Sequence, residues 1–99
     1  MKSEQAVEKY LCRQVHDRGG MCVKLNCYNG IPDRLVILPP GKDGKDGKCV
    51  FVELKADGGR VAPIQCAVHA KLRRMGQLVF ILWDFSMVDS FINYFFGGR

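Results

Sequence analysis

The chain has 99 residues, of which 47% are hydrophobic and 25% are charged, and its formal net charge is +5. These values fit one globular domain spanning residues 1–99 and exclude a disordered polar chain. No apolar run approaches the ~20 residues that cross a bilayer. The charged N-terminal segment lacks a secretory signal, so we expect a cytoplasmic protein. The positive charge favours a polyanionic partner such as nucleic acid.

The chain contains five cysteines, at positions 12, 22, 27, 49 and 66. Their number is odd and no two of them have the C-x-x-C spacing, which argues against a zinc site. We therefore expect reduced cysteines that serve as small core residues in a reducing compartment.

The first predicted element is a helix within residues 3–20, which Ser3 can cap at its N-terminus. Two glycines, Gly19 and Gly20, end it. Apolar residues recur at the spacing of one helical face. That face consists of Val7, Leu11 and Val15.

Strand patterns dominate the middle of the sequence. The predicted strands cover residues 21–27, 33–40 and 49–56. Two Asp-Gly pairs in the connector 41–48 predict the loop of a hairpin between the second and third strands. The connector lacks the alternating ligands and closing glutamate of a calcium loop.

The C-terminal third predicts a helix, a strand and a second helix. Pro63 suits the first turn of a helix over residues 63–75, and the continuous apolar run at 77–84 is typical of a strand covered on both faces. The last helix, residues 86–96, begins at a capping-box variant formed by Ser86 and Asp89. The order α-β-β-β-α-β-α predicts an α/β fold with a mixed central sheet flanked by helices.

Two charged residues, Glu53 and Lys55, lie within the apolar third strand. Residues two apart share a face of a strand, so both side chains point the same way. A buried carboxylate costs several kcal/mol unless it is paired or bound to a metal. A structural ion pair between the two residues is one explanation.

A second carboxylate favours a catalytic explanation. Counting outward from the hairpin loop, Asp33 lies opposite Lys55 and close to Glu53. Two carboxylates beside an ammonium group can hold a hard cation such as Mg²⁺. Such a cation activates water and neutralises charge on a phosphate, and the lysine can orient or deprotonate that water or stabilise developing charge.

Three short motifs in order carry a family resemblance. They are Gly30-Ile31-Pro32-Asp33-Arg34, Val52-Glu53-Leu54-Lys55 and Pro63-Ile64-Gln65. Together they resemble the PD-(D/E)XK nuclease signature and, more narrowly, its VRR-NUC branch. The resemblance implies the restriction-endonuclease-like core and an endodeoxyribonuclease that depends on Mg²⁺ or Mn²⁺.

The resemblance also implies roles for individual residues. Asp33 and Glu53 would bind the metal, helped by the backbone carbonyl of Leu54, and Lys55 would be the catalytic lysine. Gln65 would lie near the phosphate or the metal-bound waters.

The same family pattern includes a glutamate on the first helix. Both Glu4 and Glu8 are candidates, because they are one turn apart. Glu8 stands in better register with the glycine that ends the helix.

Stand-alone relatives of this size resemble phage-encoded proteins that dimerise and act on branched DNA, like Holliday junction resolvases. The resemblance therefore implies a homodimer that cuts four-way junctions. A flap or nicking nuclease with the same site, and a DNA-binding module without activity, remain alternatives. The aromatic C-terminus predicts burial against a second subunit; its residues are Phe91, Tyr94, Phe95 and Phe96.

Basic side chains outside these motifs are candidates for DNA backbone contacts. They are Lys71, Arg73 and Arg74 on the 63–75 helix, and Lys24 on the first strand. The same residues would equally suit a solvated surface. His16 and His69 have no partner motif, and we expect both on the surface or at helix ends.

Overall fold

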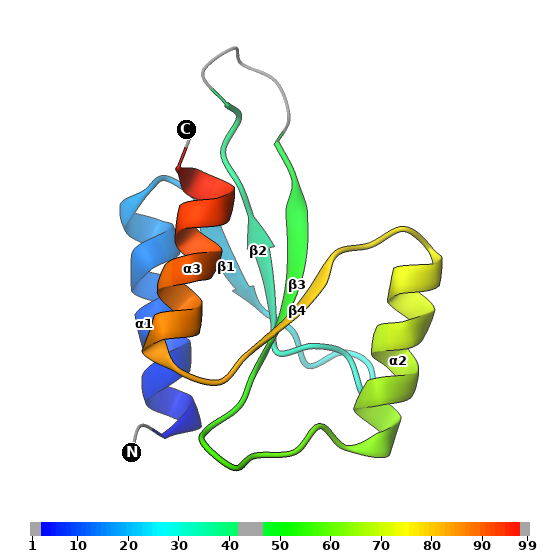
Figure 1. The fold of residues 1–99 in the computed structure, drawn as a ribbon. Coiled ribbons are helices and arrows are strands. Elements are labelled where there is room, and N and C mark those ends of the chain that lie inside the picture. Colours follow the sequence, from blue (N-terminus) through cyan, green and yellow to red (C-terminus); the bar gives the residue numbers. More distant parts are fainter. Residues whose placement is uncertain (1–2, 42–46, 98–99) are drawn as a thin grey trace.

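The computed structural model describes residues 3–41 and 47–97 (Figure 1). The elements are α1 (Glu4–Asp17), β1 (Met21–Lys24), β2 (Arg34–Ile37), β3 (Cys49–Leu54), α2 (Pro63–Arg74), β4 (Val79–Leu82) and α3 (Phe85–Phe96). The predicted order of helices and strands is confirmed, although each strand is shorter than its apolar pattern. Residues 42–46 of the predicted hairpin loop lie outside the described residues.

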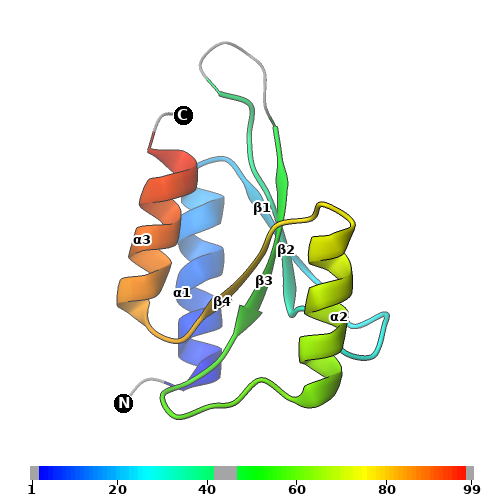
Figure 2. The same ribbon diagram turned by 45° about the vertical axis from the view of Figure 1, so that its right-hand side comes forward.

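The four strands form one mixed sheet in the order β1-β2-β3-β4. The first three strands pair antiparallel, and β3 pairs parallel with β4. Helices α1 and α3 cover one face of the sheet and α2 lies on the other (Figures 1 and 2). The mixed sheet flanked by helices is confirmed. β4 is an edge strand of this sheet.

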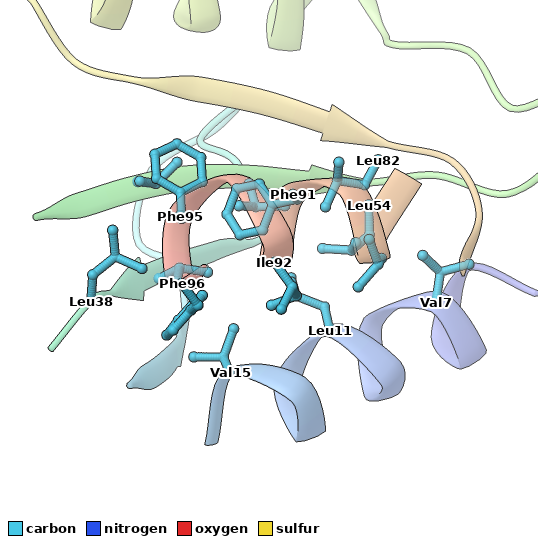
Figure 3. Close-up of a cluster of buried hydrophobic side chains, with 14 residues drawn as sticks. Val7, Leu11, Val15, Leu38, Leu54, Leu82, Phe91, Ile92, Phe95 and Phe96 are labelled. Carbon is cyan, nitrogen blue, oxygen red and sulfur yellow. The ribbon is translucent and has the colours of Figure 1, made fainter. Parts of the chain in front are cut away.

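The hydrophobic core lies between the sheet and the α1–α3 pair (Figure 3). Alternate β3 residues Val50, Val52 and Leu54 are fully buried against this layer, and each such side chain contributes roughly 1.5–3 kcal/mol to stability. The predicted face of α1 is confirmed, because Val7, Leu11 and Val15 are all 0% exposed. The odd-numbered β3 residues therefore face α2.

The start and end of α1 follow the sequence signals. The Ser3 hydroxyl accepts a hydrogen bond from the Ala6 N–H at 3.1 Å. Gly19 has φ +84°, which favours glycine. A Cβ at Gly20 would lie 2.8 Å from the Ile37 carbonyl oxygen and 2.9 Å from Val15 Cγ1. The turn from α1 into β1 is therefore closely packed.

Helix α3 departs from two expectations. Its N-cap is Asp84, whose carboxylate accepts from the Met87 N–H at 2.8 Å, so the predicted start at Ser86 is wrong. Phe91, Phe95 and Phe96 are buried within this chain, so they leave no surplus aromatic surface for a second subunit. The reason is that α3 packs its apolar face into the core beside α1. Tyr94 alone of the four aromatics is exposed, at 79%.

Other side chains also depart from the predicted pattern. Cys27, Cys49 and Cys66 are exposed rather than used in the core, and Cys12 and Cys22 are half-buried. On α2, Ile64 is 47% exposed. Across the described ranges, no helix is long and apolar enough to cross a membrane.

Candidate functional site

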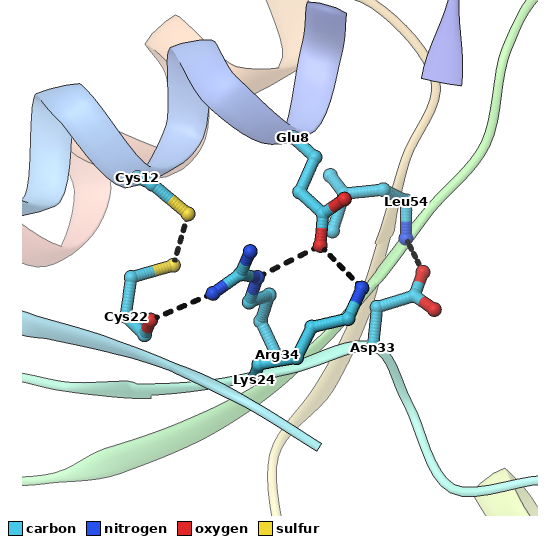
Figure 4. A network of polar contacts seen from close by, with 7 residues as sticks. All are labelled: Glu8, Cys12, Cys22, Lys24, Asp33, Arg34 and Leu54. Atoms are coloured by element: carbon cyan, nitrogen blue, oxygen red, sulfur yellow. Dashed lines mark hydrogen bonds and ion pairs between the residues drawn. The ribbon is translucent and has the colours of Figure 1, made fainter. Parts of the chain in front are cut away.

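The antiparallel pairing of β2 with β3 sets the position of the first carboxylate. Arg34 pairs with Val52 in the observed register, and continuing that register by one residue places Asp33 opposite Glu53. The sequence count placed Asp33 opposite Lys55, because it assumed a hairpin centred one residue later. Asp33 Oδ2 also accepts a hydrogen bond from the Leu54 N–H at 2.8 Å (Figure 4). The two acidic residues are thereby held at one end of the sheet.

Glu53 occupies the layer between β3 and α2 and is only 1% exposed. Its Oε2 atom accepts a hydrogen bond from Gln65 Nε2 at 3.1 Å and lies 3.5 Å from Lys55 Nζ. The Glu53–Lys55 ion pair, the structural alternative to a catalytic role, is thus present. Oε1 is buried without a hydrogen-bond partner in the described structure. The ion pair therefore leaves half of the carboxylate unsatisfied.

The electrostatic environment of Glu53 opposes its ionisation. Burial raises the pKa of Glu53, and the negative charge of Asp33 raises it further, to about 7. The neighbouring Lys55 ammonium acts in the opposite direction. A buried carboxylate whose ionisation is opposed by a neighbouring carboxylate is an arrangement that a bound cation relieves.

Gln65 has two roles in the structure. Its Oε1 accepts from the Ala62 N–H at 2.9 Å, which caps α2, while its Nε2 donates to Glu53. Pro63 precedes it in the first turn of α2. The helix start and the carboxylate are thus positioned by one amide side chain, which gives a physical reason for a Pro-x-Gln motif.

His69 is a part of this site that the sequence reasoning missed, and its expected surface position is wrong. It is 1% exposed, and its Nε2 lies 3.6 Å from Glu53 Oε1. Burial lowers the pKa of His69, with Arg73 and Lys55 acting in the same direction, so the ring is neutral at pH 7. The available signal was its spacing: His69 follows Gln65 by four residues and shares its helix face.

The α2 helix is seated on the loop before Asp33. Gly30 has φ +89°, and a Cβ there would lie 2.8 Å from both the Ile64 carbonyl oxygen and Val68 Cγ2. Glycine is therefore required for this approach. The Gly-x-Pro-Asp motif thus fixes the distance between α2 and the start of β2.

The glutamates of α1 lie apart from the α2 side of the sheet. Glu8 Oε2 accepts from Arg34 Nε at 2.8 Å and from Lys24 Nζ at 3.0 Å (Figure 4). Lys24 pairs with Arg34 across β1 and β2, so both side chains face α1. Burial raises the pKa of Glu8, but the hydrogen bonds from Arg34 and Lys24 outweigh it and lower the pKa overall. Glu4 is exposed at the start of α1.

The basic residues of α2 divide into two groups. Arg73 Nη2 donates to the Val79 carbonyl oxygen at 2.9 Å, so this arginine connects α2 to β4. Lys71 and Arg74 are exposed. Lys71 borders an open depression of about 290 Å³ together with Tyr28, Asn29 and Ile64. The depression adjoins the Gly30 loop.

The residues present fit a hard divalent cation. The unpartnered Oε1 of Glu53 offers a free oxygen beside Asp33. No cluster of three His, Cys, Asp or Glu side chains suited to a metal occurs in the described ranges. A cation there would be held by two carboxylates, backbone oxygen and water, which is the mixture that Mg²⁺ accepts. Leu54, the expected carbonyl ligand, is fixed beside Asp33 through its N–H.

Known proteins resemble this chain in sequence and in structure. No family model matches it. A protein of Acyrthosiphon pisum secondary endosymbiont phage 1, named "Putative nuclease p44", is 40% identical over 94 residues, which cover 91% of this chain and 95% of that protein. A solved structure described as "VRR_NUC domain" superposes with a TM-score of 0.79 and 31% identity, covering 96% of this chain and 99% of the other. The chain therefore belongs to the VRR-NUC family of the PD-(D/E)XK nuclease superfamily.

Proposed function

We propose that this protein is a metal-dependent endonuclease that hydrolyses phosphodiester bonds in branched DNA. The observation that carries the proposal is the buried Glu53 carboxylate, which faces Asp33, Lys55 and Gln65 and keeps one oxygen unpartnered. A protein that only binds DNA gains nothing from this costly arrangement. The phage relative named as a nuclease and the net charge of +5 support the same activity.

Each residue of the site would have a separate role in hydrolysis. Asp33 and Glu53 would hold Mg²⁺ or Mn²⁺, which lowers the pKa of a bound water and neutralises charge on the scissile phosphate. Gln65 donates a hydrogen bond to Glu53 Oε2, and this leaves Glu53 Oε1 available to bind the cation. The Lys55 ammonium lies beside the carboxylate, where it would orient the attacking water or stabilise charge that develops on the phosphate.

For the substrate we propose a four-way junction cut by a homodimer. A junction resolvase must cut two strands related by symmetry, and a twofold dimer supplies two such sites. β4 is an edge strand, and the exposed side chains Leu78 and Tyr94 border a depression beside it. Such an edge is open to a second copy of the chain.

The test is cleavage of labelled four-way, flap, nicked and linear duplex DNA with Mg²⁺, Mn²⁺ or EDTA. Lys55→Ala and Asp33→Asn proteins serve as site variants, and Lys9→Ala, on the exposed side of α1, serves as a matched lysine control. We expect paired cuts in the junction that need metal, disappear in both site variants and persist in the control.

Other outcomes replace parts of the proposal. Cleavage of flaps or nicked duplex alone would keep the site and overturn the junction substrate. Tight DNA binding without cleavage under any metal would overturn the enzyme and leave a binding module. A monomer at micromolar concentration, bound singly to a junction that it still cuts, would overturn the dimer.

A further inference from the structure

Two of the five cysteines face each other across the contact between α1 and β1. Cys12 Sγ lies 3.0 Å from Cys22 Sγ, and the two thiols are hydrogen-bonded (Figure 4). A disulfide needs an S–S distance near 2.05 Å, so the two sulfurs must approach by about 1 Å to form one. This pair lies on the opposite side of the sheet from Glu53.

The framework around the two sulfurs is fixed. Cys12 is flanked on α1 by Leu11, which is fully buried, and Val15 of the same helix packs against Gly20. The carbonyl of Cys22 accepts a hydrogen bond from Arg34 Nη1 at 3.0 Å. Because both backbones are held by contacts of their own, the close approach of the sulfurs is a property of the fold.

The pair is reachable from solvent. Both cysteines are half-buried and line an open depression of about 480 Å³, together with Arg13, His16 and Asp17. A small oxidant can therefore approach Sγ from this depression. Reactive cysteines typically occupy partly exposed, electropositive surroundings. The nearby Arg34 and Lys24 supply positive charge, which the Glu8 carboxylate partly offsets.

The two thiols differ in acidity. The hydrogen bond with Cys22 lowers the pKa of Cys12 to about 7, although burial opposes this and the charge of Arg34 assists it. The same hydrogen bond, together with burial, raises the pKa of Cys22. Cys12 is thus the more acidic thiol of the pair.

We propose that Cys12 and Cys22 are a peroxide-sensitive thiol pair that forms a reversible disulfide between α1 and β1. The Cys12 thiolate attacks one oxygen of the peroxide; the O–O bond breaks, hydroxide leaves and a sulfenic acid forms on Cys12. Cys22 Sγ then attacks that sulfur; the S–S bond forms, the S–O bond breaks and the Cys22 proton leaves with the hydroxyl as water. Two electrons pass from the sulfurs to the peroxide, and a dithiol reductant reverses the reaction.

The exposed cysteines provide the means of a clean test. A protein with Cys27→Ser, Cys49→Ser and Cys66→Ser retains only the proposed pair, and these positions are exposed, so the changes should leave folding intact. The matched controls add Cys12→Ser or Cys22→Ser to this background. Each protein is treated with hydrogen peroxide, alkylated with N-ethylmaleimide and measured by intact mass spectrometry.

The expected product is a protein lighter by two hydrogens that takes up no maleimide until dithiothreitol is added. The Cys22→Ser control should stop at a sulfenic acid that dimedone traps, and the Cys12→Ser control should react far more slowly. The disulfide closes a short loop, so we expect the Tm to rise by roughly 5–15 °C on oxidation.

Three results would overturn the proposal. They are alkylation of both thiols after peroxide treatment, over-oxidation of Cys12 without a crosslink, and linkage between different molecules instead of within one. Peptide mapping of the oxidised wild-type chain, without reduction, is a second readout that needs no variant. If that map contains no crosslinked Cys12–Cys22 peptide, the proposal is also contradicted.

Discussion

His69 Nε2 lies 3.6 Å from Glu53 Oε1, and both atoms are buried without a hydrogen-bond partner in the described structure. An unsatisfied buried polar atom costs roughly 1–3 kcal/mol. Glu53 Oε1 and His69 Nε2 face each other near Asp33, so each has hydrogen-bonding capacity that the described protein groups do not use. We infer that His69 is a positioning residue for the Glu53 carboxylate.

We expect His69→Phe to separate stability from activity. The slightly larger phenyl ring still fills the site but lacks the unpartnered nitrogen, so the free energy of unfolding should stay equal or rise by about 1 kcal/mol. Single-turnover cleavage should fall about tenfold or more, and the Mn²⁺ concentration for half-maximal rate should increase. A cavity-filling role would leave that Mn²⁺ dependence unchanged. His16→Phe, at an exposed histidine on α1, is the matched control.

The raised pKa of Glu53 predicts a pH dependence of stability without metal. The folded value is about 7 and the ordinary value is 4.5, so between them the folded state binds more protons than the unfolded state. Stability should therefore fall as the pH rises from about 4.5 to 7, by at most roughly 3 kcal/mol from this group. Urea unfolding at several pH values should show this trend in wild type but not in Glu53→Gln. Parallel curves for the two proteins would contradict it.

The two glutamates of α1 should differ in their effect on stability. Glu8→Gln leaves Arg34 and Lys24 without their anionic partner, so we expect a loss of about 1–3 kcal/mol in the free energy of unfolding. Glu4→Gln, at an exposed position, should change it by less than about 0.5 kcal/mol. Urea unfolding measures both. Equal losses of stability in the two variants would contradict the different contacts of Glu8 and Glu4. Measuring DNA cleavage by the folded fraction of each variant then tests whether either glutamate contributes to the catalytic site.

The basic residues of α2 should also fall into two classes. Lys71→Ala should weaken DNA binding and reduce the salt slope by about 1, with little change in stability. Arg73→Ala should lower stability by roughly 1–2 kcal/mol, because it removes the hydrogen bond to the Val79 carbonyl. Fluorescence anisotropy across a salt series, beside thermal unfolding, distinguishes the two. An unchanged salt slope for Lys71→Ala would remove it from the DNA surface.

Much of the fold was predictable because its signals are local. The apolar spacing of Val7, Leu11 and Val15 gave the buried face of α1 directly, and the alternation along β3 separated the core residues from Glu53. Element ends were less predictable. Both Asp84 and Ser86 can cap a helix N-terminus, and the local spacing does not decide between them. In the structure Asp84 is the N-cap of α3.

The candidate site was predictable only where a motif carried it. Asp33 and Glu53 could be brought together by counting through the hairpin, although the count placed the partner of Asp33 two residues too far along β3. His69 and the Cys12–Cys22 pair could not, because their meaning arises from contacts between elements distant in the chain. From the sequence alone His69 is expected on the surface, and only the packing of α2 on β3 places it beside Glu53.

The most direct test of the central claim is the single-turnover rate of four-way junction cleavage as a function of Mn²⁺ concentration, for wild type and Glu53→Gln. We expect the wild-type rate to rise from zero in EDTA to saturation. The Glu53→Gln rate should be lower by a factor of about 10²–10³ although the protein is folded and binds the junction. Equal rates in the two proteins, or cleavage that persists in EDTA, would contradict the assignment of Asp33 and Glu53 as a cation-dependent catalytic centre.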